Sequence, residues 1–426
     1  MKFLLILAVI GLASCAPGHV KYDGYEVLRI VPRSGNQLEW LQKFGEKFVS
    51  KLDFWKQAHD VDQPMDVMVP PHFQMELREI LEENDVTFSV LIEDVQQVIR
   101  EQMESSVSIN GIFDSFDYNV YHTYDEVMKW VTDFAAEYSS IAEEIVVTKS
   151  LEGRDIKAIK LGKKVSGKPG AFMQGGIHAR EWISPATMLN MAKKLAENYG
   201  SDAAVTAFLD TFDFYIVPVL NVDGYSYSWT NDRMWRKNRQ FNSKRLCRGV
   251  DLNRNYEYEW GGRGASSNDC DQDFRGPSAM SEPELIGLTN WLLGLKAAGQ
   301  PFHLHMDVHA YGLYWLYPWG YSKLVPLPAE AGDMDAVAQK ATSALASLYG
   351  TSYLVGGSAK AMYAASGASE DWAFGTLGAK YTYVVELRDE GRYGFLLPES
   401  QIEETALETF EALKEVGRNL VAEYGS

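Results

Sequence analysis

The spacing of hydrophobic and polar residues divides the chain into two folded regions. In the first, short segments typical of strands occur at residues 25–31, 65–69 and 86–92. Apolar residues recur at helical spacing over residues 36–51 and 73–84. We take the order of elements as strand, helix, strand, strand, helix, strand, which predicts a small α+β domain with the ferredoxin-like arrangement.

From about residue 121 onward, segments with helical spacing alternate with apolar segments typical of strands. Helices are expected at residues 124–138, 185–199, 282–298, 335–349 and 401–424. Strands are expected at residues 145–150, 155–161, 171–175, 212–219, 303–309, 353–356 and 381–387. The alternation predicts one large α/β domain, built on a single mixed, mainly parallel sheet with helices on both faces.

A polar stretch over residues 93–117 separates the two regions and is interpreted as a connecting helix and linker. Its one basic residue, Arg100, is either an ordinary surface residue or the cleavage point of a trypsin-like protease. The expected domains are therefore residues 17–110 and residues 111–426.

The N-terminus has the pattern of a secretory signal peptide, which we place at residues 1–16. Lys2 is followed by an apolar run over residues 3–13, and these 11 residues are too few to cross a bilayer. The cleavage point stays open between Cys15, Ala16 and Gly18. No later apolar run reaches the length of a membrane span, so we expect a soluble, secreted product.

Cysteine count, composition and charge narrow the class of protein. Cys15 would leave with the signal, and the remaining pair, Cys247 and Cys270, is predicted to form a disulfide. The chain is 46% hydrophobic and 23% charged, which excludes a disordered or low-complexity protein. A net charge of −18 argues against nucleic acid or an anionic membrane as a partner.

Candidate metal ligands follow two of the predicted strands, at the carboxyl ends where α/β proteins collect their functional residues. The strand at 171–175 is followed by His178 and Glu181, whose spacing lets both bind one ion, although this motif alone is a weak signal. A catalytic zinc ion usually takes three protein ligands and keeps one position open. His309, at the carboxyl end of another predicted strand, is the expected third ligand.

Charged residues near these ligands suggest acid–base and anion-binding chemistry. Glu386 ends a further apolar strand, and a partly desolvated carboxylate there would serve as a general base. The structural alternative is an ion pair with Arg388. Arginines and asparagines gather at residues 232–239 and 250–255, where they could bind a carboxylate or stabilise an oxyanion, unless each segment is simply a solvated loop.

Several multi-residue motifs occur together in a characteristic order. They are His178-Ala179-Arg180-Glu181, Arg233-Met234-Trp235-Arg236-Lys237-Asn238-Arg239, Asp251-Leu252-Asn253-Arg254-Asn255, His309-Ala310-Tyr311, Tyr363-Ala364-Ala365-Ser366-Gly367, Glu386-Leu387-Arg388-Asp389 and Gly391-Arg392-Tyr393-Gly394-Phe395. Over its whole length the chain resembles the pancreatic-type zinc carboxypeptidases of the A/B subfamily. The N-terminal region resembles their inhibitory activation domain, so the resemblance implies a full-length preproenzyme that removes single C-terminal amino acids.

The resemblance also implies the catalytic roles. The ligands of one zinc ion would be His178, Glu181 and His309. Asp251 would accept a hydrogen bond from the other ring N–H of His178 and so orient that ligand. Arg236 would polarise the scissile carbonyl, and Glu386 would take a proton from the attacking water.

The same resemblance implies how the substrate is held. Asn253 and Arg254, with Tyr363 closing over them, would grip the free C-terminal carboxylate of a peptide. Arg180 and Tyr311 would line the neighbouring subsites. A bond in the middle of a chain offers no such carboxylate, so the enzyme would trim ends and not cut internally.

In this family, the residue before an Asp-Trp pair forms the base of the pocket for the leaving residue. A-type enzymes have an apolar residue there and B-type enzymes have Asp, whereas this chain has Glu370. A carboxylate would attract Lys or Arg, so we favour basic specificity over A-type or mixed specificity for apolar and aromatic ends. Ser358 and Val384 match neither type firmly, and Lys360 on the same segment could neutralise Glu370.

Partners follow from the same resemblance: peptides with a free C-terminal carboxylate, an activating trypsin-like protease, and protein inhibitors of carboxypeptidases. We expect a monomer in an extracellular, digestive setting. Residues 17–110 carry 17 acidic and 9 basic side chains, so acidic residues of the propeptide are expected to meet the active-site arginines. A non-catalytic binding protein of the same family is the less favoured alternative, because the metal ligands and the base are all present.

Overall fold

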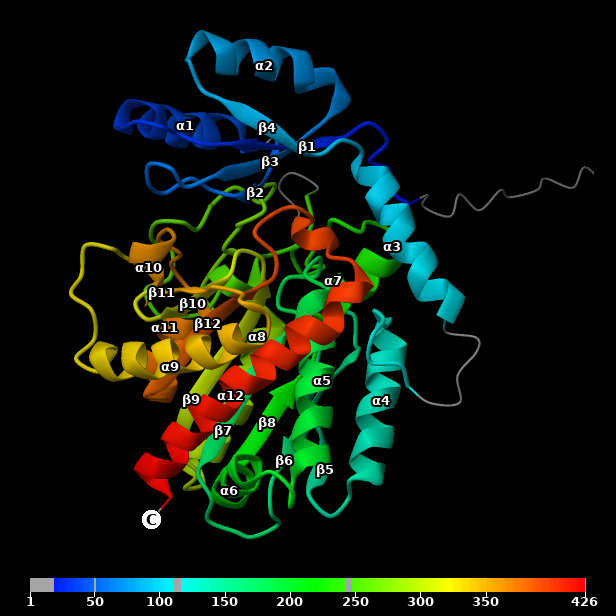
Figure 1. The fold of residues 1–426 in the computed structure, drawn as a ribbon, viewed down its shortest axis with the longest axis vertical. Helices are drawn as coiled ribbons and strands as arrows, with labels where there is room; N and C mark the ends of the chain where they lie inside the picture. The colour runs from blue at the N-terminus through cyan, green and yellow to red at the C-terminus, as the bar shows by residue number, and fades with distance from the viewer. Residues whose placement is uncertain (1–18, 50, 110–115, 243–246, 426) are drawn as a thin grey trace, which may run out of the picture.

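The computed structural model describes residues 19–49, 51–109, 116–242 and 247–425 (Figure 1). The predicted signal peptide, residues 1–16, lies outside the described residues. None of the described helices is long and apolar enough to cross a membrane. A small N-terminal domain lies at the top of Figure 1, over one end of the large domain, and helix α3 (Val95–Ile109) runs down from it.

The small domain has a four-stranded antiparallel sheet in the order β2-β3-β1-β4. Its strands are β1 (Glu26–Ile30), β2 (Asp53–Lys56), β3 (Met65–Val69) and β4 (Phe88–Ile92). Two helices, α1 (Gly35–Phe48) and α2 (Gln74–Glu83), contribute to a separate hydrophobic core that includes Leu41, Phe44 and Leu77. This is the predicted order of elements, although the spacing of apolar residues did not mark β2.

The large domain is built on one eight-stranded sheet in the order β11-β10-β12-β9-β7-β8-β6-β5. The strands are β5 (Ala142–Lys149), β6 (Asp155–Leu161), β7 (Gly170–Gly175), β8 (Asp213–Val217), β9 (Phe302–Ala310), β10 (Tyr314–Tyr317), β11 (Leu354–Gly357) and β12 (Tyr381–Leu387). The four central strands β12, β9, β7 and β8 are parallel to one another, as are β10 and β11, whereas the β10/β12, β6/β8 and β5/β6 pairs are antiparallel. The sheet is mixed, as predicted.

Helices cover both faces of this sheet. They are α4 (Tyr124–Glu137), α5 (Ile183–Asn198), α6 (Ala203–Thr211), α7 (Val222–Thr230), α8 (Pro283–Ala297), α9 (Ala331–Tyr349), α12 (Ile402–Tyr424) and two short turns, α10 (Ser358–Ala361) and α11 (Ser369–Trp372). On β7, Phe172 packs against Trp291 of α8, whereas Gly175 lies against α5. Because side chains alternate along a strand, these contacts lie on opposite faces.

Besides the short turns α10 and α11, two helices and one strand of the large domain were not predicted. Helices α6 and α7 are only 9 residues long, and α7 is mostly polar and aromatic, so neither has a long apolar stripe. Strand β10 has the sequence Tyr-Trp-Leu-Tyr and is buried at every position. A short, continuous apolar run of this kind shows no periodicity, and its neighbours β11 and β12 define it as a strand.

The parallel strands bring functional segments to one edge of the sheet. His309 of β9 is paired in register with Glu386 of β12, and Gly175, at the end of β7, is paired with Val308. After β7 the chain turns through Gly176, whose φ of +63° lies in the left-handed region that favours glycine. This turn carries the next segment toward the ends of β9 and β12.

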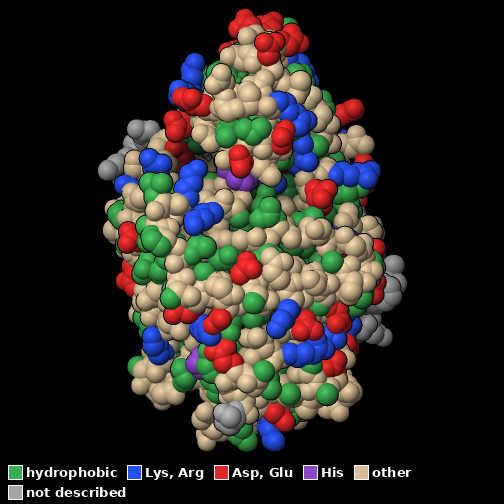
Figure 2. All heavy atoms as spheres, turned by 60° about the vertical axis from the view of Figure 1, so that its left-hand side comes forward, with side chains coloured by type: hydrophobic (Ala, Val, Ile, Leu, Met, Phe, Trp, Pro, Cys, Tyr) green, Lys and Arg blue, Asp and Glu red, His purple; other side chains and the backbone are tan. Residues whose placement is uncertain are grey.

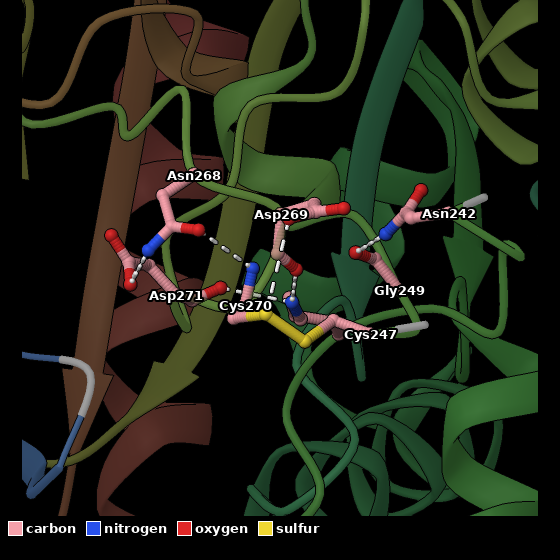
Figure 3. The surroundings of a disulfide bond; sticks show 8 residues. Asn242, Cys247, Gly249, Asn268, Asp269, Cys270 and Asp271 are labelled. Carbon is pink, nitrogen blue, oxygen red and sulfur yellow. Dashed lines mark hydrogen bonds between the residues drawn. A yellow bond between two sulfur atoms is a disulfide. The ribbon is translucent and has the colours of Figure 1, made fainter. Parts of the chain in front are cut away.

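A disulfide joins Cys247 to Cys270, as the cysteine count predicted (Figure 3). The loop that it closes contains the segment from Asp251 to Arg254. Lys237 donates from Nζ to the backbone carbonyls of Asp269 and Asp271, both at 2.9 Å, which ties the preceding arginine-rich segment to the same loop. The disulfide therefore stabilises two segments that carry candidate site residues.

Charge is distributed unevenly over the surface. In Figure 2, acidic and basic side chains are interspersed over the large domain, and acidic side chains gather at the tip of the small domain. Helix α2 lies at that tip in Figure 1, and its exposed glutamates are Glu76, Glu79, Glu82 and Glu83. This distribution agrees with the acidic balance of residues 17–110.

Candidate active site

Two histidines and a glutamate converge at the carboxyl edge of the sheet. Nδ1 of His178 lies 2.8 Å from Oε1 of Glu181 and 3.1 Å from Nδ1 of His309, and His309 Nδ1 lies 3.3 Å from Glu181 Oε2. All three side chains are buried, and they form a group able to hold a metal ion. Two imidazole nitrogens and one carboxylate oxygen are the ligand set of a catalytic zinc site with one open position.

The outer nitrogen of His178 also has a carboxylate partner. Its Nε2 lies 3.2 Å from Oδ1 of buried Asp251, and Oδ2 of the same carboxylate accepts a hydrogen bond from Arg236 Nη2 at 2.9 Å. Although burial raises the pKa of Asp251, Arg236 and His178 hold it well below its usual value. Asp251 therefore contacts an imidazole and a guanidinium at once, through one oxygen each.

Asn253 and Arg254 lie in a one-turn 3₁₀ helix directly after Asp251. The Asn253 amide oxygen accepts from the Ser369 backbone N–H at 2.8 Å, and Arg254 donates from Nε to the Gly264 carbonyl at 2.6 Å. Gly367 has a φ of +73°, and a Cβ there would come within 2.5 Å of the Arg254 carbonyl oxygen. The absence of a side chain lets the segment that carries Tyr363 pack against this turn.

Glu386 faces the metal-ligating group from β12. Burial raises the pKa of its carboxyl to about 8, whereas His309 opposes the rise. A divalent cation beside it would lower this pKa, because a nearby positive charge favours the carboxylate. The alternative role, an ion pair with Arg388, is not formed: Arg388 instead binds Glu404 and Glu408, each at 2.6 Å.

Glu370, from the short helix α11, is 4% exposed and lines the same pocket. Burial raises its pKa, and its Oε2 has no hydrogen-bond partner among the described residues. Ser358 and Val384 also line the pocket, but Lys360 is exposed and forms no ion pair with Glu370 in the described part of the chain. The Glu370 carboxylate is therefore available to a ligand that enters the pocket.

One pocket gathers most of the residues that the sequence singled out. It is lined by His178, Glu181, Arg236, Asn253, Arg254, His309, Tyr311, Tyr363, Glu370 and Glu386. Arg180 and Asp251 are not among the lining residues but contact them: the Arg180 guanidinium lies 4.1 Å from the ring centroid of Phe395, and Asp251 bonds His178.

The N-terminal domain covers this pocket with strand β2. The Asp53 carboxylate forms a buried ion pair with Arg180 at 2.6 Å and accepts from Trp55 Nε1 at 3.1 Å. Trp55 and Lys56 line the pocket itself, and the Trp55 ring packs against Phe395 with centroids 5.1 Å apart. The expectation that acidic propeptide residues meet active-site arginines agrees with this contact.

A second contact lies beside the first. Tyr311 donates from its hydroxyl to Asp66 Oδ2 at 2.9 Å, and the same carboxylate binds Arg29 through two hydrogen bonds of 2.7 Å. Neither β2 nor Asp66 was named as functional from the sequence. The sequence feature that could have pointed to these contacts is the short segment from Asp53 to Lys56, in which acidic, aromatic and basic side chains follow one another.

Two family models match the chain. A zinc carboxypeptidase model matches residues 127–412, and a carboxypeptidase activation peptide model matches residues 28–102. Human carboxypeptidase B is 36% identical over 421 residues, 98% of each chain. Bovine carboxypeptidase A1 is 37% identical over 414 residues, 96% of each chain.

Solved structures agree with these matches. Thrombin activatable fibrinolysis inhibitor superposes with a TM-score of 0.82 at 32% identity, covering 93% of this chain and 98% of that one. Carboxypeptidase A from Helicoverpa armigera superposes with a TM-score of 0.85 at 28% identity, covering 96% and 100%. The fold and site define a metallopeptidase with an N-terminal inhibitory domain. The chain belongs to the zinc carboxypeptidase family and is a preproenzyme of its A/B subfamily.

The contact between Asp53 and Arg180 gives a first prediction. Asp53→Ala leaves a buried guanidinium without its partner, which typically costs about 3–5 kcal/mol. We therefore expect the propeptide to hold less tightly and the uncut zymogen to hydrolyse a peptide substrate roughly tenfold faster or more. Asp62→Ala is the control, because Asp62 pairs with Arg33 at an exposed site. Equal activities of the two uncut variants would contradict the prediction.

Proposed function

We propose that this carboxypeptidase is secreted as a zymogen and releases single basic residues, Lys or Arg, from the C-termini of peptides and proteins. The observation that carries the proposal is the buried carboxylate of Glu370, which lines the pocket and has an oxygen without a partner among the described residues. The relatives of type A and type B are equally similar to the chain, so the choice rests on this side chain.

Binding begins with the C-terminal carboxylate of the peptide. Arg254 would pair with it and Asn253 would donate to it, with Tyr363 closing the pocket from the opposite segment. The leaving side chain would then extend toward Glu370. An incoming ammonium or guanidinium favours the ionised form of this buried acid and gives its free oxygen a partner.

The chemical step uses the other side of the pocket. His178, Glu181 and His309 would hold a zinc ion, whose chemistry would be to polarise the substrate carbonyl and to make water more acidic. Glu386 would take the proton from the attacking water and pass it to the leaving amine. Arg236, held by Asp251, would donate to the carbonyl oxygen as negative charge develops on it.

The strength of the proposed Glu370 contact can be bounded. At an effective dielectric constant near 20, two opposite charges 4 Å apart attract by about 4 kcal/mol before desolvation is counted. An apolar side chain would instead leave the buried acid unpaired. The second candidate specificity, for apolar or aromatic ends, is favoured by the raised pKa of Glu370, because a neutral carboxyl is less costly beside an apolar group.

A mutation at Glu370 separates these two specificities. We expect wild-type enzyme to prefer a peptide ending in Lys over the same peptide ending in Phe, and Glu370→Gln to lower kcat/KM for Lys by roughly 10–100-fold with little change for Phe. Lys360→Ala, on an exposed neighbour, should keep the wild-type ratio. Turnover of the Phe peptide by wild-type enzyme at the rate of the Lys peptide would exclude the proposal.

A mutation at Glu386 tests the proposed base. Glu386→Gln keeps the size of the side chain but removes the proton acceptor, so kcat should fall by roughly 10²–10⁴-fold. Zinc content, measured by atomic absorption, should stay at one ion per chain. The matched control is Glu390→Gln, since Glu390 is an exposed glutamate nearby. If Glu386→Gln keeps wild-type kcat, Glu386 is not the base.

We further propose that activation follows cleavage at Arg100 by a trypsin-like protease, in the connecting helix near the end of the expected domain 17–110 and ahead of the expected domain 111–426. Arg100 lies on α3 with its side chain 55% exposed, and its nearest acid, Asp23, is 3.9 Å away. Gln102 on the same helix donates to the Leu397 carbonyl of the large domain, so α3 must unwind locally before it is cut.

Trypsin treatment of the zymogen tests this site. The wild-type chain should gain activity against a C-terminal Lys peptide, whereas Arg100→Gln should remain inactive under the same treatment. Arg33→Gln, in the exposed part of the small domain, should activate normally. N-terminal sequencing of the product identifies the cut. Full activation of Arg100→Gln would place the cleavage elsewhere.

The remaining parts of the proposal concern setting and partners. A signal-like N-terminus and a disulfide support secretion into an extracellular compartment, such as a digestive lumen. We also propose that the enzyme is a monomer. Bovine thrombin-activatable fibrinolysis inhibitor has been solved in complex with tick carboxypeptidase inhibitor. We propose that protein inhibitors of this kind would enter the pocket that β2 now covers.

A further inference from the structure

The outer nitrogen of His309 has a carboxylate neighbour of its own. Nε2 of His309 lies 3.1 Å from Oδ2 of Asp307, which is two residues earlier on β9 and fully buried. Residues i and i+2 of a strand point to the same face, so the two side chains lie beside each other by construction. The metal-facing nitrogen, Nδ1, points to His178 and Glu181 on the opposite side of the ring.

The amide of Asn253 competes for the same nitrogen, because its Nδ2 lies 3.4 Å from His309 Nε2. A neutral imidazole that binds a metal through Nδ1 carries its proton on Nε2. That N–H can donate to a carboxylate but cannot accept from an amide N–H. Zinc binding therefore selects Asp307 as the partner and leaves the Asn253 amide hydrogens for the substrate carboxylate.

Asp307 is itself fixed in place. The Ser369 hydroxyl donates to Asp307 Oδ2, and the Ser369 backbone N–H donates to Asn253 Oδ1 at 2.8 Å. The Asn253 backbone N–H in turn donates to Asp251 Oδ1 at 2.9 Å, the oxygen that faces His178. One hydrogen-bonded chain thus joins the outer partners of both metal-ligating histidines.

We propose that Asp307 is a second positioning residue of the zinc site, which accepts the Nε2–H of His309 as Asp251 accepts that of His178. Such outer carboxylates hold the ring of a ligating histidine in one orientation and tautomer and strengthen it as a ligand. Ser369 precedes Glu370 in the sequence, so the same support connects the zinc site to the base of the pocket.

A purely structural role for Asp307 makes a different prediction. Its second oxygen, Oδ1, has no hydrogen-bond partner among the described residues, so the buried charge is only partly compensated. If Asp307 served only to stabilise the fold, its removal would break buried contacts with His309 and Ser369 and lower the stability of the protein with and without zinc. A positioning role instead makes the protein with zinc bound the form that suffers.

The test measures zinc affinity and stability in the full-length zymogen. Asp307→Asn should lower zinc affinity by about 10–100-fold in competition with a chelator, and should lower the melting temperature of the zinc-bound protein by more than that of the zinc-free protein. Asp213→Asn, which removes a buried carboxylate at the opposite end of the sheet, is the control. It should lower the melting temperatures of both forms and leave zinc affinity unchanged.

Proton NMR of the zinc-loaded zymogen gives a second readout. Two imidazole N–H resonances protected from exchange are expected, one from His178 and one from His309. Asp307→Asn should shift or remove only the His309 resonance. Should Asp307→Asn fail to fold, Ser369→Ala is used, which removes the hydroxyl bond to Oδ2 and should lower zinc affinity about threefold and shift the same resonance. Zinc affinity within twofold of wild type in the folded variant, with both resonances in place, would overturn the proposal.

Discussion

The parallel register of β7, β9 and β12 places His309 beside Glu386. It also brings the turn after Gly175 close enough for His178 and Glu181 to form one metal-binding group with His309. The other features of the site depend on this register. A slip of one residue in β9 would turn His309 to the opposite face and so remove a metal ligand and the neighbour of the proposed base together. The helices packed on both faces of the sheet therefore stabilise a register as much as a hydrophobic core.

Converging ligands also bury charge, and the structure compensates that charge in pairs. Asp251 binds His178 and Arg236, while Asp307 faces His309. A buried carboxylate without a partner would be expensive. Glu370 differs from these residues, because it forms no ion pair in the described part of the chain and its Oε2 has no hydrogen-bond partner there. This difference separates a side chain that supports the site from one suited to bind a ligand.

The propeptide uses the same principle to block the enzyme. Arg180 is buried in the zymogen, and Asp53 supplies the carboxylate that keeps it paired. Trp55 and Lys56 occupy the pocket beside it, and burial lowers the pKa of Lys56. Inhibition therefore rests on a short strand, β2, that is held by one ion pair and by aromatic packing against Phe395. Such a contact is stable while the chain is intact and can be released once the propeptide is cut free.

The sequence alone determined the family, the order of most strands and helices, the disulfide, and the set of candidate ligands. It could do so because strand and helix periodicities are local and because the motifs around His178, Asp251, His309 and Glu386 extend over several residues. It did not predict β10, which shows no periodicity, or β2. The four residues of β2 show their role only in the tertiary structure, where they cover the pocket. Which charged groups pair was decided by the tertiary structure: Arg388 with Glu404 and Glu408, Arg180 with Asp53, and His309 with Asp307. Arg388 and Arg180 pair with residues more than 15 positions away, so no local pattern of residues encodes those pairs. Strand alternation places Asp307 beside His309, but only the tertiary structure orients the two rings and carboxylates around one site.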